Sequence, residues 1–493
     1  MPAMKVLKRL FPFAVIAAAA LLLLYSPDIA PPRYTDLATF FRTEMKRQGI
    51  SGLSVAAVAD GSVLYVDGFG KDGSGAAIGP ETPVYAAAAA MPLAALAAAS
   101  LESDKKISLD STVRYYLPWF GFTRPKGDPT LRDLVAHASG ASASTFDDEH
   151  PAAPDLDTAG RSMLKAVPQN APGELFHFIE TDYQVLALAM EKAAGMPYAA
   201  ILKYRVLAPL GMRSTGEGTE PLPRGSASFF SLPLPRAAPR SAFGASSSHI
   251  ATTASDLGQY MAFLMGPEKF GRGPVSARAA ANLLVPLEHG GTYGYGFYIS
   301  SSKDGRLAYS DGSIDGFSSR IDLWPDERTG IALMSAQDSF LLSDISLPAL
   351  AQGARRIVLE GSAPRPFPLG RLYILLAVMA IVHVSALAFQ TGGALRWTKE
   401  VKDRAEAKGS SGPVLLAAAR CWIGMAVRAA IVLAFPASLA LALDRAMSWK
   451  TLLEIEPGLA AWCILACMFG FMRNVTRLAW LRSPGFFRRT RAA

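Results

Sequence analysis

The sequence has few of the residues that bind metals or form disulfide bonds. It contains three cysteines and six histidines in 493 residues. Cys421, Cys463 and Cys467 lie in or beside long apolar runs, so we expect the domain before those runs to have no disulfide and to be stabilised by its core. The histidines are scattered, with no His-x-x-x-His pair and no Cys-x-x-Cys motif. This pattern argues against a metal site.

The chain also lacks a glycine-rich phosphate loop after a predicted strand, so we expect no nucleotide cofactor. Its net charge of +8 is unevenly distributed: residues 1–34 carry +3, residues 35–365 carry −5 and residues 366–493 carry +10. A protein that binds nucleic acid would need a basic stripe on a folded face, and the middle segment shows none. We therefore expect no nucleic-acid partner.

Four long apolar runs are present instead, at residues 10–25, 372–389, 422–443 and 459–471. About 20 apolar residues are needed to cross the ~30 Å hydrocarbon core of a bilayer as a helix. The first three runs are near that length, and the fourth is short. The sequence therefore predicts an N-terminal membrane anchor and about three further transmembrane helices, with the lipid bilayer as a partner. The first run could instead be a cleaved signal peptide.

Basic residues flank these runs on one side only. Lys5, Lys8 and Arg9 precede the first run, five basic residues lie within 396–408 between the second and third, and the C-terminal tail is arginine-rich. Cytoplasmic loops carry the excess of Lys and Arg, so the N-terminus is predicted to be cytoplasmic and the large middle domain extracytoplasmic. Arg428 lies within the third run, near enough to its cytoplasmic end for the guanidinium to reach the interface.

The pattern of strands and helices predicts an α+β fold for the middle domain. Two β-rich runs, residues 53–59 and 62–66, flank Asp60-Gly61 and are typical of a hairpin. A second group of strands is expected over residues 295–335, with helices between the two groups. Residues 221–248 lack periodicity and are expected to be a surface loop. We divide the chain into an N-terminal stub and anchor at 1–34, the α+β domain at 35–362 and a membrane domain at 363–493.

Several local phrases in this domain resemble the serine β-lactamase and penicillin-binding (D-Ala-D-Ala peptidase) family, class C branch. The phrases follow the family's order and spacing over about residues 35–360. They are Thr82-Pro83, Pro92, Ile107-Ser108-Leu109-Asp110, Tyr116-Leu117-Pro118, Thr130 to Gly140, Pro172-Gly173 through Tyr183, Pro209-Leu210-Gly211-Met212, Gly312 to Ser319 and Pro325-Asp326. The resemblance implies an antiparallel sheet flanked by helices with a helical insert, displayed at the inner membrane of a bacterium.

The family's first catalytic motif is altered in this sequence. The family uses a serine nucleophile and a lysine one helical turn later, so that the amine can deprotonate the hydroxyl. Counting back from Pro92, these positions are Ala88 and Met91. Neither side chain can attack a carbonyl or transfer a proton.

The two other motifs of the family are altered as well. The Tyr-x-Asn motif falls on Phe178-Ile179-Glu180, which replaces a phenol by a phenyl ring and an amide by a carboxylate. The Lys-Thr-Gly motif falls on Ser310-Asp311-Gly312 and loses the cation that would attract a substrate carboxylate. The resemblance leaves only a backbone oxyanion hole, formed by the N–H groups of Ala88 and Ser313.

These losses favour a catalytically inactive family member that binds, senses or scaffolds, with a cell-wall peptide or an envelope protein as partner. One alternative is a peptidase or esterase that uses Glu180 with Asp311, or a displaced serine. Another places the function in the membrane helices. Ser-x-x-Lys also occurs at Ser103/Lys106, Ser162/Lys165 and Ser300/Lys303, which is near chance frequency. His137 is expected to be a structural hydrogen-bonding residue, and His177 with Glu180 makes a poor metal site.

Overall fold

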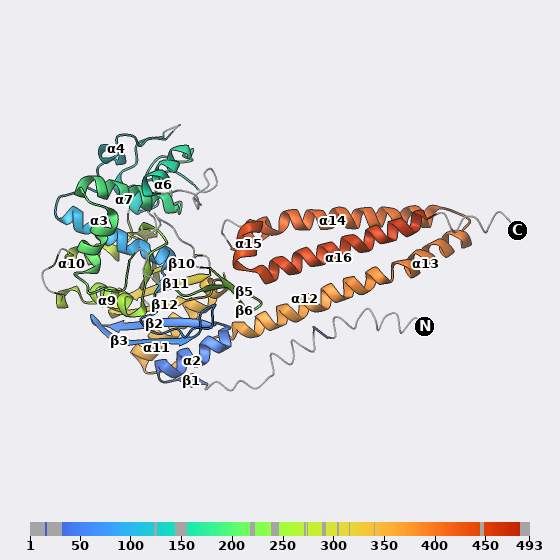
Figure 1. Ribbon diagram of the computed structural model, residues 1–493, viewed down its shortest axis with the longest axis horizontal. Coiled ribbons are helices and arrows are strands. Elements are labelled where there is room, and N and C mark those ends of the chain that lie inside the picture. The colour runs from blue at the N-terminus through green and yellow to red at the C-terminus, as the bar shows by residue number, and fades with distance from the viewer. Residues whose placement is uncertain are drawn as a thin grey trace. The chain divides into compact units, whose positions relative to one another are not determined.

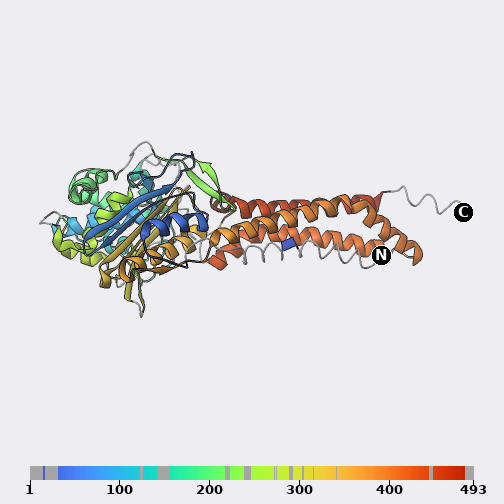
Figure 2. The ribbon, with the colours of Figure 1, turned by 90° about the horizontal axis from the view of Figure 1, so that it is seen from below.

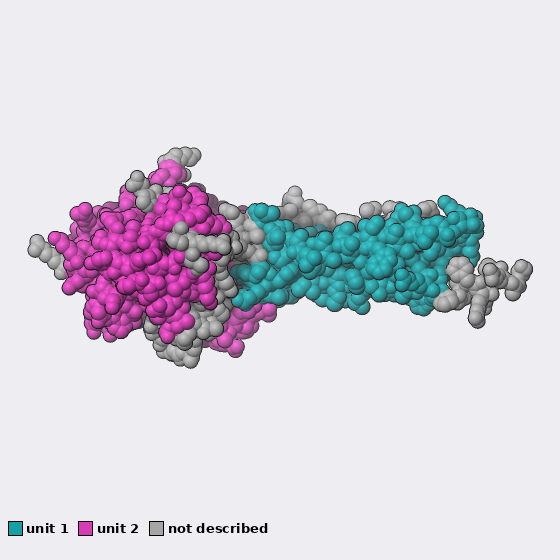
Figure 3. Space-filling view, turned by 90° about the horizontal axis from the view of Figure 1, so that it is seen from above, with its two compact units in different colours: residues 1–29, 228–232, 369–493 teal, residues 30–227, 233–368 magenta. Residues whose placement is uncertain are grey.

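The computed structural model divides into two compact units, which Figure 3 shows in separate colours. One unit comprises residues 30–227 and 233–368, and the other comprises residues 1–29, 228–232 and 369–493. The described residues are 15–16, 32–122, 126–142, 155–216, 222–237, 246–270, 273, 275–287, 292–302, 305–314, 316–339, 341–443 and 448–483. Of the first apolar run only two residues are described, so the predicted N-terminal anchor lies outside them.

A seven-stranded antiparallel sheet forms the centre of the larger unit (Figure 1). Its strand order is β3-β2-β12-β11-β10-β9-β8. The strands are β2 (Gly52–Ala59), β3 (Ser62–Gly70), β8 (Tyr293–Gly294), β9 (Phe297–Ser302), β10 (Gly305–Ile314), β11 (Phe317–Trp324) and β12 (Thr329–Ser335). Figure 2 shows the blue N-terminal strands lying beside the gold later strands. The prediction of one sheet built from both ends of the domain is confirmed.

The hairpin between β2 and β3 forms where the sequence predicts it. Asp60 and Gly61 both have positive φ, 48° and 68°. A two-residue hairpin turn of the type that matches strand twist needs positive φ at both central positions, which Asp and Gly tolerate. The turn therefore sets the register in which β2 and β3 pair.

Helices cover both faces of the sheet because the side chains of each strand alternate between them. Leu53, Val55 and Ala57 of β2 lie in a core with α2 (Leu37–Gln48) and α11 (Leu347–Glu360). Ala56 and Val58 of the same strand lie in a larger core on the opposite face. That core includes α9 (Ala254–Met265), which contacts β2 and β12, and the helical insert.

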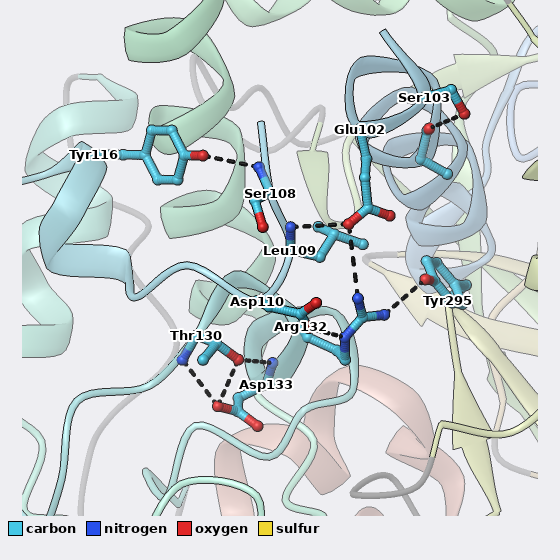
Figure 4. A network of polar contacts seen from close by, with 11 residues as sticks. Glu102, Ser103, Ser108, Leu109, Asp110, Tyr116, Thr130, Arg132, Asp133 and Tyr295 are labelled. Carbon is cyan, nitrogen blue, oxygen red and sulfur yellow. Dashed lines mark hydrogen bonds and ion pairs between the residues drawn. The ribbon is translucent and has the colours of Figure 1, made fainter. Parts of the chain in front are cut away.

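The helical insert extends from the sheet and contains short helices joined by polar contacts. Its helices are α3 (Met91–Ser103), α4 (Val113–Tyr116), α5 (Leu131–Val135), α6 (Leu156–Ser162), α7 (Glu180–Ala194), α8 (Tyr198–Leu202) and α10 (Ala277–Leu283). Arg132 of α5 donates to Asp110 at 2.7 Å and to the Tyr295 hydroxyl at 3.1 Å (Figure 4). The hydrogen bond from Arg132 holds the pKa of Asp110 below its usual value. This network joins the start of α5 to the loop between α3 and α4 and to the turn between β8 and β9.

The expected loop at residues 221–248 contains regular structure, so that prediction was wrong in part. Residues Gly225–Phe229 (β5) and Leu232–Arg236 (β6) form a two-stranded sheet. A second short pair joins β4 (Val84–Tyr85) to β7 (Ala251–Thr252), just after this segment. β6 was not predicted because its two prolines disfavour a strand, although Pro is tolerated on the edge of a sheet.

The smaller unit is helical. Its helices are α12 (Leu369–Gly392), α13 (Ala394–Ala407), α14 (Gly412–Leu443), α15 (Trp449–Ile455) and α16 (Pro457–Arg482). Three helices in the described part of the chain are each long and apolar enough to cross a membrane: α12, α14 and α16. The fourth apolar run, which looked short, is part of a helix of 26 residues, because residues 472–482 continue the helix beyond the run.

Gly353 of α11 provides a test of packing on the α2 and α11 face. A Cβ added there would lie 2.4 Å from the Phe40 ring of α2. We expect Gly353→Val to destabilise the domain by about 2 kcal/mol because neither helix can move without disturbing the core. Thermal unfolding of the full chain in detergent would measure the change.

The matched control is Gln352→Val, which adds the same β-branched residue to the same helix at a position that is not fully buried. It should change the unfolding midpoint little. Valine has a higher helix propensity than glycine, so a Gly353→Val variant as stable as the wild type would show that the contact with Phe40 carries no cost.

Candidate functional site

The family's nucleophile position lies in a strained turn at the start of α3. Residues Ala87–Ala90 form a short 3-10 helix, η1, and Ala87 has φ of 46°, a conformation that non-glycine residues avoid. The neighbouring residue, Ala86, donates its N–H to Ile250 O at 3.0 Å and accepts a hydrogen bond from the Ser319 hydroxyl. These contacts hold the turn in place. Ala88 lies within η1, and its side chain is outside the described part of the structure.

Met91, at the family's lysine position, is fully buried. The Tyr293 hydroxyl lies 4.0 Å from its Sδ atom. Burial raises the pKa of Tyr293 well above its ordinary value, so this phenol is neutral at physiological pH. Met91 therefore fills the position with a packed thioether, where the family would have an amine.

Phe178, at the family's tyrosine position, packs on His137. The two ring centroids are 4.7 Å apart, and His137 also lies 5.1 Å from the Tyr293 ring. His137 is fully buried, with Nδ1 3.3 Å from Asp182 Oδ2, and its carbonyl accepts from the N–H of His177. These contacts agree with the structural role predicted for His137. The aromatic rings link the start of α3, the end of α5, the start of α7 and β8.

Glu180 is the first residue of α7, where a carboxylate is favoured by the helix dipole. Its Oε2 atom accepts hydrogen bonds from the hydroxyls of Ser248 at 2.9 Å and Ser247 at 3.2 Å. The Ser248 hydroxyl also lies 2.9 Å from Nδ1 of His249. The carboxylate is thus already bound by two hydroxyls, and its neighbours come from the segment before β7.

Sequence reasoning missed Ser247, Ser248 and His249. The run of three serines followed by a histidine at 246–249 was visible, but it lay in a segment expected to be a loop. Its position beside Glu180, more than 60 residues earlier in the chain, depends on the pairing of β7 with β4. No local sequence signal indicates that contact.

The third motif lies on β10, and strand alternation separates its residues. Ser310 is paired with Ile321 and is buried on the face that holds the larger core. Asp311 lies on the other face, where Arg320 donates to its Oδ2 atom at 3.1 Å. Arg320 also lies 2.7 Å from Asp322, whose pKa burial raises to about 6. Asp311 therefore shares the Arg320 guanidinium with Asp322.

The structure does not bring Glu180 and Asp311 together as a catalytic pair. Glu180 contacts Ser247 and Ser248, whereas Asp311 contacts Arg320 on the opposite face of the sheet. Because side chains alternate along a strand, Asp311 and Ser310 do not form one patch.

Part of β10 has an open edge next to the candidate site. β9 pairs with residues 305–309 of β10, and β11 pairs with residues 308–314. Within the described chain, residues 311–314 therefore have a strand neighbour on one side only. β10 also contacts η1, so Gly312 and Ser313 belong to an element that adjoins the turn containing Ala88. A shared oxyanion hole of Ala88 and Ser313 stays a prediction.

The other Ser-x-x-Lys pairs show no catalytic arrangement in the described residues. The Ser103 and Ser162 hydroxyls donate to main-chain carbonyls of their own helical turns, Ala99 and Ala159. Ser300 is exposed on β9, and Lys303 lies outside the described residues. No group of three or more His, Cys, Asp or Glu side chains that could hold a metal occurs in the described part of the chain.

His249 gives the site a testable pH dependence. Burial lowers the pKa of His249 from 6.5 to about 4 in the folded protein. Between these values the unfolded chain binds a proton that the folded chain does not, so stability falls as the pH falls from 6.5 to about 4. The full effect is about 3 kcal/mol at ~1.4 kcal/mol per pKa unit. His249→Gln should remove this part of the pH dependence, measured by chemical unfolding of the full chain at several pH values.

Ser248→Ala is the matched variant, because it removes the hydroxyl beside the imidazole and retains the imidazole. It should keep most of the slope between pH 6.5 and 4. An unchanged slope in His249→Gln would show that this histidine is accessible to protons in the folded protein.

Comparisons with known proteins agree with the fold. A family model described as Beta-lactamase matches residues 37–354. Protein flp of Staphylococcus aureus strain COL is 21% identical over 316 residues, which cover 62% of this chain and 63% of that protein. Putative penicillin-binding protein PbpX of Bacillus subtilis strain 168 is 29% identical over 175 residues, 35% of this chain and 42% of PbpX. The chain thus spans less than two thirds of the length of these curated relatives.

Two solved structures share the fold at low sequence identity. The octameric penicillin-binding protein homologue from Pyrococcus abyssi has a TM-score of 0.55 and 22% identity, covering 66% of this chain and 77% of its own. A beta-lactamase/D-alanine carboxypeptidase from Yersinia pestis has a TM-score of 0.53 and 21% identity, and the match covers 64% of this chain and 95% of that protein. The family model covers more than half of the chain, and the sheet and helical insert agree with it; the chain belongs to the Beta-lactamase family.

Proposed function

We propose that the protein is a membrane-anchored member of the Beta-lactamase family that binds a ligand at the bacterial cell envelope without hydrolysing it. The observation that carries this proposal is the burial of Met91 against Tyr293 at the position of the family's lysine. A serine hydrolase needs a hydroxyl or thiol nucleophile and a base that accepts its proton. A thioether accepts no proton at physiological pH, and Ala88 carries no hydroxyl.

The altered positions remain well packed. Met91 and Phe178 lie among aromatic rings, and Glu180 accepts hydrogen bonds from Ser247 and Ser248. A backbone oxyanion hole alone would contribute about 10²–10³-fold to a reaction, and it has no nucleophile to assist here. Binding without a covalent step is the function that this arrangement supports best.

The open edge of β10 supports an extended peptide as the ligand. Residues 311–314 pair with β11 and with no other described strand, so their outward backbone groups can pair with an added strand. One protein that shares this fold is the beta-lactamase/D-alanine carboxypeptidase from Yersinia pestis. We therefore propose a cell-wall peptide, or a peptide segment of an envelope protein, as the partner at this edge.

Covalent labelling tests whether the site is inactive. The purified full chain, incubated with a fluorescent penicillin and with a fluorophosphonate, should form no adduct by intact mass under conditions that fully label an active serine carboxypeptidase. The physical reason is that neither Ala88 nor Met91 can attack the probe. A stoichiometric adduct on any residue would overturn the proposal.

A second candidate function is hydrolysis with Ser248 as a displaced nucleophile. It is favoured by the 2.9 Å distance from the Ser248 hydroxyl to His249 Nδ1, which could accept its proton. The hydroxyl is also bound to Glu180, and Ser248 is only 1% exposed, which opposes attack on a substrate. An adduct that forms in the wild type and disappears in Ser248→Ala would favour this candidate.

Three apolar helices support membrane anchoring. α12, α14 and α16 have lengths of 24 to 32 residues, enough to cross the ~30 Å hydrocarbon core. Under the positive-inside rule, the basic loop after α12 and the basic end of α16 lie in the cytoplasm. We propose that the Beta-lactamase domain lies on the outer side of the inner membrane.

Cysteine accessibility tests this orientation. In a background with the three native cysteines changed to serine, Ser108→Cys places a thiol on the exposed surface of the domain and Ser411→Cys places one in the loop before α14. A membrane-impermeant maleimide should label only the Ser108→Cys variant in intact spheroplasts, because the bilayer blocks its access to Ser411→Cys. Both variants should label after detergent lysis. Labelling of Ser411→Cys in intact spheroplasts would contradict the orientation.

A further inference from the structure

Three arginines of the helical unit have no acidic partner in the described residues. The guanidinium of Arg428 on α14 donates to the carbonyl of Gly424 at 2.7 Å. Arg473 of α16 donates to the Gln390 side chain, and the Arg477 guanidinium lies 4.5 Å from the centre of the Trp397 ring. These contacts leave the positive charge of all three side chains uncompensated. In an apolar setting such a charge is costly unless an anion lies nearby.

Glycines on both helices shape the position of Arg428. A Cβ on Gly470 of α16 would lie 1.9 Å from Arg428 Nε, and one on Gly424 would lie 2.7 Å from the Asn474 side chain. Arg428 therefore lies across the surface of α16 at a point where any larger residue would displace it. Its hydrogen bond to Gly424 bends the side chain toward the N-terminal end of α14, the end expected at the cytoplasm.

A groove begins at Arg428 and continues between α14 and α16. Its volume is about 450 Å³, and every lining side chain except Arg428 is apolar or a cysteine. Leu433 and Phe471 on its walls are 79% and 47% exposed in the described structure. The groove thus has one cationic end and one apolar end.

We propose that this groove binds an anionic phospholipid, with one acyl chain between α14 and α16 and the phosphate at Arg428. This inference rests on the proposed membrane placement. A guanidinium binds phosphate through paired N–H donors, and basic pockets between transmembrane helices on the cytoplasmic side bind anionic lipid headgroups. Acyl chains are equally apolar in all lipids, so selectivity must come from the headgroup charge.

The test compares lipids and matched arginine variants. The full chain, purified in detergent, is titrated with phosphatidylglycerol or with phosphatidylcholine of the same acyl chains, and bound lipid is counted by native mass spectrometry. We expect phosphatidylglycerol to bind more tightly than phosphatidylcholine. Arg428→Gln should weaken phosphatidylglycerol binding about tenfold, the effect of losing one hydrogen bond to a charged group. Arg420→Gln removes the same charge from an exposed position of α14 outside the groove lining and should have little effect.

Two native cysteines give a second measurement. Cys467 lines the groove, whereas Cys463, one helical turn earlier on α16, is not among its lining residues. Bound phosphatidylglycerol should slow the reaction of Cys467 with N-ethylmaleimide in the wild type, and Arg428→Gln should abolish that protection. The reaction of Cys463 should depend less on the lipid.

Four outcomes would overturn the proposal. Equal binding of the two lipids would show that the groove takes any acyl chain, and equal effects of Arg428→Gln and Arg420→Gln would show that the charge acts non-specifically. Displacement of the lipid by inorganic phosphate at low concentration, or cross-linking of residues 10–25 into the groove, would assign it to another occupant. Carbonate extraction of cell membranes tests the membrane placement independently of the lipid site. Release of the protein by carbonate would refute the membrane placement itself.

Discussion

The pairing of β2 with β12 is the contact on which the rest of the larger unit depends. It joins strands that are more than 250 residues apart in the chain, with Ala56 opposite Ala332 at its centre. The Ser335 hydroxyl donates to Gly52 O at 2.9 Å and closes the end of the pair. Because the chain must be closed into a long loop before this pair can form, its cost in entropy is offset by cores on both faces of the sheet. Only with the pair formed do β10 and β11 come to lie beside η1.

The strained turn at Ala87 shows why the scaffold can persist while the catalytic side chains are replaced. The left-handed conformation of Ala87 costs about 1–2 kcal/mol. The preceding residue, Ala86, is held by two hydrogen bonds, one to the carbonyl of Ile250 next to β7 and one from the hydroxyl of Ser319 on β11. These contacts belong to the sheet and its neighbours. They do not use the side chains of Ala88 or Met91, the positions predicted for the family's serine and lysine, so the turn does not depend on a hydroxyl or an amine there. Fold and chemistry are carried by different residues here.

Local sequence signals predicted much of this fold. Asp60-Gly61 predicted the first hairpin, and the spacing from Pro92 and Tyr183 placed Met91 and Phe178 in positions that the structure links through Tyr293 and His137. The contacts that the sequence could not predict join distant segments. Ser248 reaches Glu180 only because β7 pairs with β4, and no periodicity encodes that pairing. The face occupied by Asp311 was predictable, because the period of a strand puts it opposite to that of Ser310.

The positions that the resemblance assigns to the catalytic site have partners in the structure. A carboxylate at the half-buried position 180 would be poorly solvated without hydrogen-bond donors, and a polar residue at position 91 would face aromatic rings. Instead two serine hydroxyls donate to Glu180, and the thioether of Met91 lies against Tyr293, a contact that sulfur makes favourably. Such matched changes at separate elements keep the site folded without a nucleophile.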